Sequence, residues 1–154
     1  MRALQARGVA CVEESARAVI QQSVTQTGVR PSGPAFCDAL LARDVAAFHA
    51  AGAERTIFDR CLVDAWATAR AIGLAPWTPG DLAVRALRLN RRAFIAPPWK
   101  SIFRNDAERI QTWEEAVEAF DACAAAYADA GYELIELPLT DPSRRAAFVL
   151  DACA

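Results

Sequence analysis

The sequence predicts an α/β fold in which helices cover both faces of a parallel sheet. Short apolar runs alternate along the chain with longer segments whose apolar residues recur at helical spacing. The composition, with 54% hydrophobic and 23% charged residues, is that of a globular protein. No internal repeat or low-complexity linker divides the 154 residues, so we predict a single domain that spans residues 1–154.

The first half of the chain is expected to form two strands and three helices after a helical start. A polar loop at residues 25–34, "TQTGVRPSGP", is rich in turn-forming residues and separates the first two of these helices. Gly73 is a typical signal for the end of the third helix. In chain order, the expected elements are a strand at 8–12, helices at 13–24 and 35–53, a strand at 55–59 and a helix at 60–73.

The second half is expected to add two more strands and three more helices. The pair Pro97-Pro98 ends the first of these strands, because proline has no N–H group to donate to a sheet. Asp141 followed by Pro142 is a typical start for the last helix, with a capping aspartate and proline at the first position. The expected elements are a helix at 79–90, a strand at 92–98, a long helix at 106–131 that ends at Gly131, a strand at 132–138 and a helix at 141–154.

Charge, hydropathy and cysteine usage argue against several classes of function. The net charge of −2 at pH 7 disfavours a basic nucleic-acid-binding surface. No apolar run approaches the ~20 residues that span a bilayer, and the start "MRALQARGVACVEE" lacks the apolar core of a signal peptide. Scattered cysteines and a single histidine give poor support for a zinc site. We therefore expect a cytoplasmic protein with reduced, mostly buried thiols at Cys11, Cys37, Cys61, Cys123 and Cys153.

Charged residues follow the predicted strands at the edge where parallel sheets of this kind bind ligands. Open α/β sheets bind ligands outside the carboxyl ends of their strands. Here those ends carry Glu13-Glu14, Asp59-Arg60 and residues 97–100, and we expect the three to converge. The pair Asp59-Arg60 has two interpretations: phosphate and magnesium chemistry, or a helix N-cap followed by a solvated arginine.

A basic segment follows the third predicted strand and leads into the long helix. In "PPWKSIFRNDAERIQTWEEA", the residues Lys100, Arg104 and Arg109 lie in or next to a loop. Arginine recognises phosphoryl oxygens through two parallel hydrogen bonds, and a mobile loop can exclude water from phosphoryl transfer. The segment is therefore either a lid over phosphates or a solvated basic turn that pairs with Glu108 or Glu114.

Four stretches of the sequence resemble a known family. They are "ARGVACVEESARAVI", "FDRCLVDAWATARAIGL", "AFIAPPWKSIFRNDAERIQTWEEAVEAF" and "YADAGYELIELP", and the likeness runs from about residue 3 to residue 150. Together they look like the AAA-type predicted ATPases of bacteria, which are compact P-loop NTPases similar in build to nucleoside and nucleotide kinases. The resemblance implies a three-layer α/β/α domain with a parallel sheet. It also implies ATP and Mg²⁺ as cofactors and a small-molecule phosphoryl acceptor.

The chain departs from that family at its start. Members begin with a strand and a phosphate loop of the GxxGxGKS/T kind, and no GxxxxGKS/T occurs anywhere in these 154 residues. The resemblance therefore implies that the first strand, the phosphate loop, its lysine and its magnesium-binding hydroxyl are missing. We expect weak or no binding of Mg·ATP by this chain, because the loop's N–H groups form the phosphate cradle. A late start codon, a decayed gene and a genuinely short, non-catalytic relative are the three explanations.

The resemblance assigns roles at the first two strand ends. Glu14 stands in the family's "E-x-x-R" position with Arg17, and its carboxylate would act as base for a substrate hydroxyl or orient a magnesium-bound water. The other interpretation of Glu14 is an acid in the first turn of a helix, where it suits the helix dipole. Asp59 would help to hold magnesium through water, and Arg60 would contact a phosphoryl group. Cys61 replaces the glycine usual after this pair, which puts close substrate approach in doubt.

The remaining roles fall on the basic segment. Arg104 and Arg109 would be lid residues that stabilise charge on the transferring phosphoryl group. Lys100 and Trp99 would contact the nucleotide, with Trp99 against the base, and Arg17 would join them. The predicted function is thus an ATPase or small-molecule kinase of the P-loop class. The alternative is a non-catalytic interaction protein, whose exposed sheet edge recruits a partner or a second copy of the chain.

Overall fold

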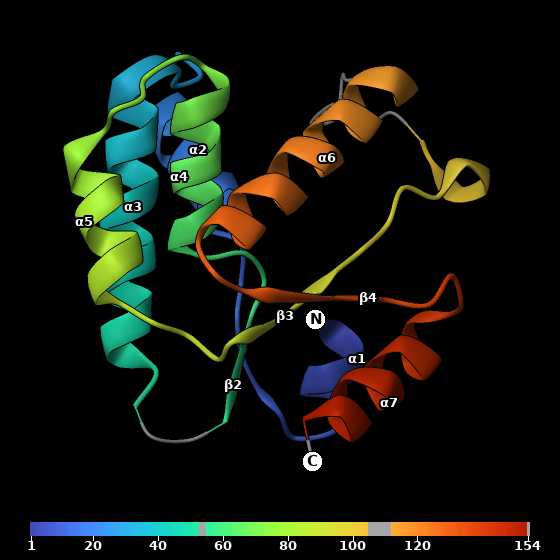
Figure 1. Ribbon diagram of the computed structural model, residues 1–154. Helices are drawn as coiled ribbons and strands as arrows, with labels where there is room; N and C mark the ends of the chain where they lie inside the picture. The colour runs from blue at the N-terminus through green and yellow to red at the C-terminus, as the bar shows by residue number, and fades with distance from the viewer. Residues whose placement is uncertain (53–54, 105–111, 154) are drawn as a thin grey trace. The chain divides into compact units, whose positions relative to one another are not determined.

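The chain has the mixed α/β architecture that the sequence predicts. A computed structural model describes residues 1–52, 55–104 and 112–153 (Figure 1). It divides into two compact units, Met1–Leu89 and Asn90–Ala154, and each is described by itself below. Helices and parallel strands alternate in both units. The single domain and the three-layer arrangement stay predictions.

The first unit is built around a parallel pair of strands. Strands β1 and β2 run in register from Ala10 opposite Thr56 to Val12 opposite Phe58. The N–H of Asp59 donates to the carbonyl oxygen of Val12 over 2.8 Å, so the pairing continues one residue beyond β2. The carboxyl ends of β1 and β2 therefore lie side by side. The elements of this unit are α1 (Arg2–Gln5), β1 (Ala10–Val12), α2 (Ser15–Thr27), α3 (Gly33–Ala50), β2 (Thr56–Phe58), α4 (Leu62–Ala71) and α5 (Thr78–Ala86).

The core of the first unit lies between its helices. Helix α3 packs against α2, α4 and α5, and α4 also packs against α5. Leu62 and Val63, the first residues of α4, are at most 1% exposed. Full burial of such a side chain stabilises the fold by about 1.5–3 kcal/mol, so the start of α4 is firmly anchored. The other fully or largely buried apolar residues on α3 and α4 are Cys37, Leu40, Leu41, Ala65 and Ala69.

Two tryptophans tie the helices of the first unit together. The indole N–H of Trp77 donates to Asp38 of α3 over 3.1 Å, and that of Trp66 donates to Asp81 of α5 over 2.8 Å. Gly80 makes this packing possible, because a Cβ there would lie 2.3 Å from a ring atom of Trp77. Both hydrogen bonds therefore serve helix packing.

The second unit repeats the parallel pairing with different strands. Strands β3 and β4 run in register from Arg92 opposite Glu133 to Ile95 opposite Glu136. Helix α6 packs against β4, and the rings of Phe94 and Phe148 meet edge to face at 6.4 Å. The elements of this unit are β3 (Arg92–Ile95), the 3-10 turn η1 (Lys100–Ile102), α6 (Trp113–Asp129), β4 (Glu133–Glu136) and α7 (Pro142–Ala152).

Several predicted helix ends are confirmed. Asp141 caps α7, with its carboxylate accepting from the N–H groups of Ser143 and Arg144 over 2.9 and 3.0 Å, and Pro142 is the first helical residue. Gly73 and Gly131 take left-handed conformations just after α4 and α6, with φ of 74° and 83°. Glycine adopts this conformation without strain, which is why it ends helices.

Other predicted boundaries are wrong by a few residues. Strand β1 begins at Ala10 rather than residue 8, because Gly8 has φ 77° and its N–H closes a turn onto Gln5. Strand β3 stops at Ile95, since the prolines after it cannot donate to a ladder. Helix α5 ends at Ala86 instead of residue 90. The predicted start of the long helix, at 106–111, lies outside the described residues. Among the described residues, α6 begins at Trp113, and Thr112 is its N-cap residue.

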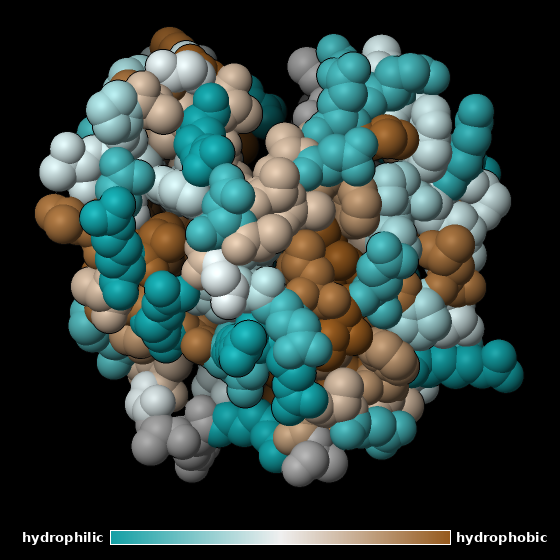
Figure 2. Space-filling view, in the orientation of Figure 1, coloured by the Kyte–Doolittle hydropathy of each residue, from teal (hydrophilic) through white to brown (hydrophobic). Residues whose placement is uncertain are grey.

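Residues 25–34 form a shorter loop than expected, because α2 runs to Thr27 and α3 begins at Gly33. Hydrophilic and apolar residues are interspersed over the face that Figure 2 shows. Within the described residues, no helix has the length and apolar character needed to cross a membrane.

Candidate functional site

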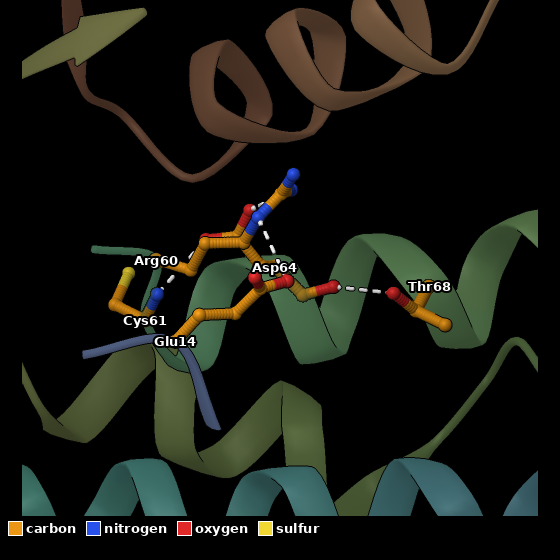
Figure 3. A network of polar contacts seen from close by, with 5 residues as sticks. All are labelled: Glu14, Arg60, Cys61, Asp64 and Thr68. Carbon is orange, nitrogen blue, oxygen red and sulfur yellow. Dashed lines mark hydrogen bonds and ion pairs between the residues drawn. The ribbon is translucent and has the colours of Figure 1, made fainter. Parts of the chain in front are cut away.

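The best-defined polar site lies at the carboxyl ends of β1 and β2 (Figure 3). Glu14 follows β1 as the N-cap residue of α2, and Arg60 lies in the short link between β2 and α4. Because the two strands pair in register up to Val12 and Phe58, these residues come together although 46 positions separate them in the chain. The expected convergence of the first two strand ends is therefore found. The third expected strand end, at 97–100, belongs to the second unit.

Arg60 is held between two carboxylates. Its Nε lies 3.5 Å from Oε1 of Glu14, and its Nη1 lies 3.1 Å from Oδ1 of Asp64. The Arg60 side chain is 56% exposed, whereas those of Glu14 and Asp64 are 33% and 16% exposed. The guanidinium group is thus accessible to a ligand, but an incoming anion must compete with two acids already in place. We call Glu14, Arg60 and Asp64 the Arg60 network.

The backbone of Arg60 is unusual. Its φ is 73°, and among the described residues it is the single non-glycine position with positive φ. Side chains other than glycine rarely adopt this left-handed conformation, which costs of order 1–3 kcal/mol. The strain permits a sharp turn between β2 and α4. An ion-paired side chain held in a strained turn at a strand end is typical of a functional position.

Asp64 connects this turn to the start of α4. Its Oδ2 accepts from the N–H of Cys61 over 2.9 Å, while its Oδ1 contacts Arg60. Cys61 is the N-cap residue of α4, so the interpretation of Asp59 as the N-cap is wrong. Asp64 is not among the site residues that the sequence predicts. Its signals were an acid in the first turn of a helix, three positions after Cys61 and four after Arg60.

Asp59 and Arg17 occupy exposed positions beside this network. Asp59 is exposed and its backbone continues the strand pairing onto β1. Within the described residues, no group of three or more metal-ligating side chains is assembled. A single carboxylate can still serve Mg²⁺, which keeps several waters and takes other ligands from phosphates. Arg17 lies in the first turn of α2 with an exposed side chain.

A buried acid lies behind the network. Asp44 of α3 and Ser15, the first residue of α2, are each 9% exposed. Burial raises the pKa of Asp44 to about 6; the polar side chain of Ser15 opposes this shift, and the negative charge of Asp64 adds to it. Asp44 is also absent from the site residues that the sequence predicts. Its signal was an aspartate in line with the buried residues Cys37 and Leu41, at helical spacing.

In the second unit, Lys100 and Arg104, which follow β3, and Arg145 of α7 contact aromatic rings or the backbone. The Lys100 ammonium group lies 5.8 Å from the ring centroid of Trp113, and the Arg145 guanidinium lies 6.0 Å from that of Trp99. Arg104 is exposed and donates to the carbonyl oxygen of Phe103 over 2.7 Å. These contacts leave the three cations near the surface of the unit.

The remaining residues of the expected lid are only partly described. Arg109 lies outside the described residues, as does Glu108, one of the two acids expected to pair with this turn. The rings of Phe103 and Trp113 meet edge to face at 5.5 Å, which fixes the described part of the segment to the start of α6. The role of Arg104 and Arg109 as a lid stays a prediction.

Comparison with known proteins identifies the family. A sequence model of the AAA domain matches residues 1–145, a range that contains both strand pairs and the whole Arg60 network. No curated protein matches the chain significantly, and no solved structure does. The family match supports a nucleotide-binding function of the P-loop NTPase type. The chain therefore belongs to the AAA domain family.

Proposed function

We propose that the protein takes part in ATP-dependent phosphoryl transfer or hydrolysis, with Mg²⁺ and an unidentified small-molecule acceptor. The observation that carries this proposal is the Arg60 network at the carboxyl ends of two parallel strands. This is the edge where open α/β sheets bind ligands. The match to the AAA domain family supports a nucleotide as the ligand at this edge.

The charges of the Arg60 network suit a substrate that brings both a phosphoryl group and a hydroxyl. In this proposal Arg60 turns from the carboxylates to the phosphoryl oxygens, which frees the Glu14 carboxylate to accept a proton from a hydroxyl or to orient a water. The exposed side chain of Asp59 holds Mg²⁺ through water. Supporting the exchange, Arg60 is more than half exposed and its contact with Glu14 is long, at 3.5 Å.

We propose that three residues outside the strands contact the nucleotide. Arg17 and Lys100 supply positive charge, and Trp99 offers a ring to the base. Arg104 and Arg109 close over the phosphates and stabilise the charge that develops on the transferring group. Among the described residues, these roles are supported by the exposed positions of Arg17, Lys100 and Arg104 and by the partial exposure of Trp99.

The phosphate cradle is not encoded in these 154 residues, which contain no GxxxxGKS/T. We propose that a preceding segment supplies it, and that the 154-residue chain without this segment binds Mg·ATP weakly or not at all. We also propose a cytoplasmic protein, in keeping with five free cysteines, two buried and three partly buried. No role with nucleic acid or membrane is proposed.

The second candidate function is a non-catalytic interaction protein. Among the described residues, each strand pairs with one other strand, in two separate two-stranded sheets. A sheet of two short strands offers its outer edges to a further strand. A partner strand or a second copy of the chain would then bind by edge pairing.

Titration calorimetry with Mg·ATP separates the two functions. The 154-residue chain should show no micromolar binding. A version extended by the upstream in-frame coding sequence should bind. In that extended version, Arg60→Ala should reduce the affinity at least about tenfold, as expected for loss of a charge-assisted hydrogen bond. Arg85→Ala, at an exposed position on α5, is the matched control and should bind like the parent.

Micromolar binding by the 154-residue chain would show that the cradle is dispensable. If the extended chain fails to bind while the 154-residue chain forms dimers in sedimentation, the interaction function is the better one.

A further inference from the structure

We propose that Asp64 is the positioning residue for Arg60: one carboxylate oxygen holds the backbone of the turn that carries Arg60, and the other holds the guanidinium group beside Glu14. This proposal rests on the proposed function for its purpose, because a charged group acts best on a phosphoryl group when its place is set in advance. The contacts that it invokes exist in the free protein and can be tested there without a nucleotide.

The two carboxylate oxygens of Asp64 have different partners. Oδ2 accepts from the N–H of Cys61 over 2.9 Å, and Oδ1 accepts from Nη1 of Arg60 over 3.1 Å (Figure 3). The Cys61 N–H belongs to the peptide bond that directly follows Arg60. Asp64 therefore contacts the side chain of Arg60 and the backbone next to it at once. A rotation that carried the guanidinium group away would break at least one of the two contacts.

The turn at Arg60 is held by a hydrogen bond on each side. Its φ of 73° is a conformation that arginine rarely adopts, so neighbouring contacts must keep it in place. Before the turn, the N–H of Asp59 donates to the carbonyl oxygen of Val12 over 2.8 Å, which ties the chain to β1. After the turn, the N–H of Cys61 is tied to Asp64. The second of these bonds depends on a side chain, so a substitution can remove it.

Asp64 is itself firmly placed at the start of α4. Its neighbours Val63 and Ala65 are at most 1% exposed. Its carbonyl oxygen accepts from the hydroxyl of Thr68 over 2.8 Å. The Asp64 side chain is 16% exposed, against 33% for Glu14, and its contact with Arg60 is the shorter of the two. Since water and salt screen a partly buried ion pair less than an exposed one, Asp64 is the firmer partner of Arg60.

A plain helix cap is the alternative role for Asp64. An acid at the third helical position that accepts from the N-cap N–H is a common arrangement, and it would serve only the start of α4. Positioning predicts more, because Arg60 should lose its place even when the cap remains. Asparagine separates the two roles. Its single side-chain oxygen can accept from Cys61, whereas its NH₂ group cannot accept from Arg60.

The test measures hydrogen exchange by ¹⁵N NMR in the 154-residue chain without any ligand. It follows the Nε–H of Arg60, the backbone N–H of Cys61 and, as the reference for α4 as a whole, that of Ala69, which is 1% exposed. Asp64→Asn should raise the Arg60 exchange rate about tenfold, as for loss of one charge-assisted hydrogen bond, and leave Cys61 and Ala69 near the parent rates. Asp64→Ala should raise the rates at both Arg60 and Cys61 about tenfold, because both contacts are lost.

Asp81 provides the matched control. It is likewise an acid in the first turn of its helix, and its carboxylate accepts from the indole N–H of Trp66 over 2.8 Å. Asp81→Asn changes the net charge by the same amount as Asp64→Asn does. It should leave the exchange rates at Arg60 and Cys61 as in the parent.

The proposal is wrong if Asp64→Asn leaves the Arg60 exchange rate as in the parent, because Asp64 would then be a helix cap alone. It is also wrong if Asp64→Asn accelerates Ala69 as much as Arg60, or if Asp81→Asn accelerates Arg60 equally, since either result would mean a general loosening. Should Asp64→Ala fail to fold, Asp64→Asn decides the question. Since no nucleotide is used, failure of ATP binding leaves this result intact.

Discussion

The two units of the chain share a parallel strand pair but hold their charged residues in different ways. In the first unit, Arg60 is fixed by carboxylates at 3.1 and 3.5 Å and by a strained backbone with φ 73°. In the second, Lys100 and Arg145 lie over tryptophan rings at 5.8 and 6.0 Å. Cation–π contacts at exposed sites stabilise by only about 0.5–1 kcal/mol.

This difference suggests a division of tasks between the two units. Groups that must meet a reacting atom are most effective when their position is fixed before the ligand arrives. Loosely held cations on aromatic rings can follow a ligand as it binds or leaves. The first unit carries Glu14 and Arg60, which we propose for proton transfer and phosphoryl contact. The second carries Trp99 and Lys100, which we propose for nucleotide contact, and the cations proposed to close over the phosphates.

The largest expected effect comes from the core behind the Arg60 network. Leu62→Ala should lower the free energy of unfolding of the first unit by about 2–5 kcal/mol, because Leu62 is 1% exposed and begins the helix that carries Asp64. Urea unfolding followed by tryptophan fluorescence measures the loss. Leu82→Ala is the matched control; Leu82 is 61% exposed, so the change should stay within about 0.5 kcal/mol. Equal effects at the two leucines would contradict a well-packed first unit.

The next effect concerns the buried acid and has a defined pH range. The pKa of Asp44 is raised from 3.8 to about 6, so the folded protein binds this proton more tightly than the unfolded chain does. Its contribution to stability is complete below about pH 4 and is lost as the pH rises through about 6. Asp44→Asn has no carboxyl group to ionise and should not show this loss. Its free energy of unfolding relative to the parent should therefore rise by about 1–3 kcal/mol between about pH 4 and pH 6. Denaturant unfolding at pH 4, 5, 6 and 7 measures the difference, and a constant difference would contradict the buried, ionising acid.

Strain at Arg60 predicts a smaller effect on stability, which distinguishes the contribution of the backbone from that of the side chain. Arg60→Gly and Arg60→Ala both remove the contacts with Glu14 and Asp64, but only glycine accepts φ 73° without strain. We expect the glycine variant to be more stable than the alanine variant by about 1 kcal/mol. Thermal unfolding of the two variants side by side tests this, with Arg85→Gly and Arg85→Ala as the helical control pair, where the order should reverse. Equal stability of the two Arg60 variants would remove the argument from strain.

The smallest effect is expected in the second unit. Arg145→Ala should lower stability by no more than about 0.5–1 kcal/mol, the range of an exposed cation–π contact. Ala146, its neighbour on α7, is 4% exposed, so Ala146→Ser provides a buried comparison with a larger loss. Denaturant unfolding is again the measurement. A loss above about 2 kcal/mol for Arg145→Ala would mean that the second unit fixes its cations as firmly as the first.

Local signals in the sequence determined most of the element order and several helix ends. Asp141 with Pro142 starts α7, and glycines follow α4 and α6, because capping and left-handed turns depend on residues a few positions apart. The sequence also indicated Glu14 and Arg60 as residues of a shared strand edge, since an acid and a base directly follow two apolar runs.

Only the tertiary structure decided which groups meet and which are buried. The contact between Glu14 and Arg60 joins residues 46 positions apart, and it depends on the register of β1 against β2. The burial of Asp44 depends on how α3 packs against its neighbouring helices. The left-handed turn at Arg60 lets Asp64 contact both the Arg60 side chain and the N–H of Cys61. Distances between chain segments and the loss of water around a side chain arise from packing, so no short stretch of sequence contains them.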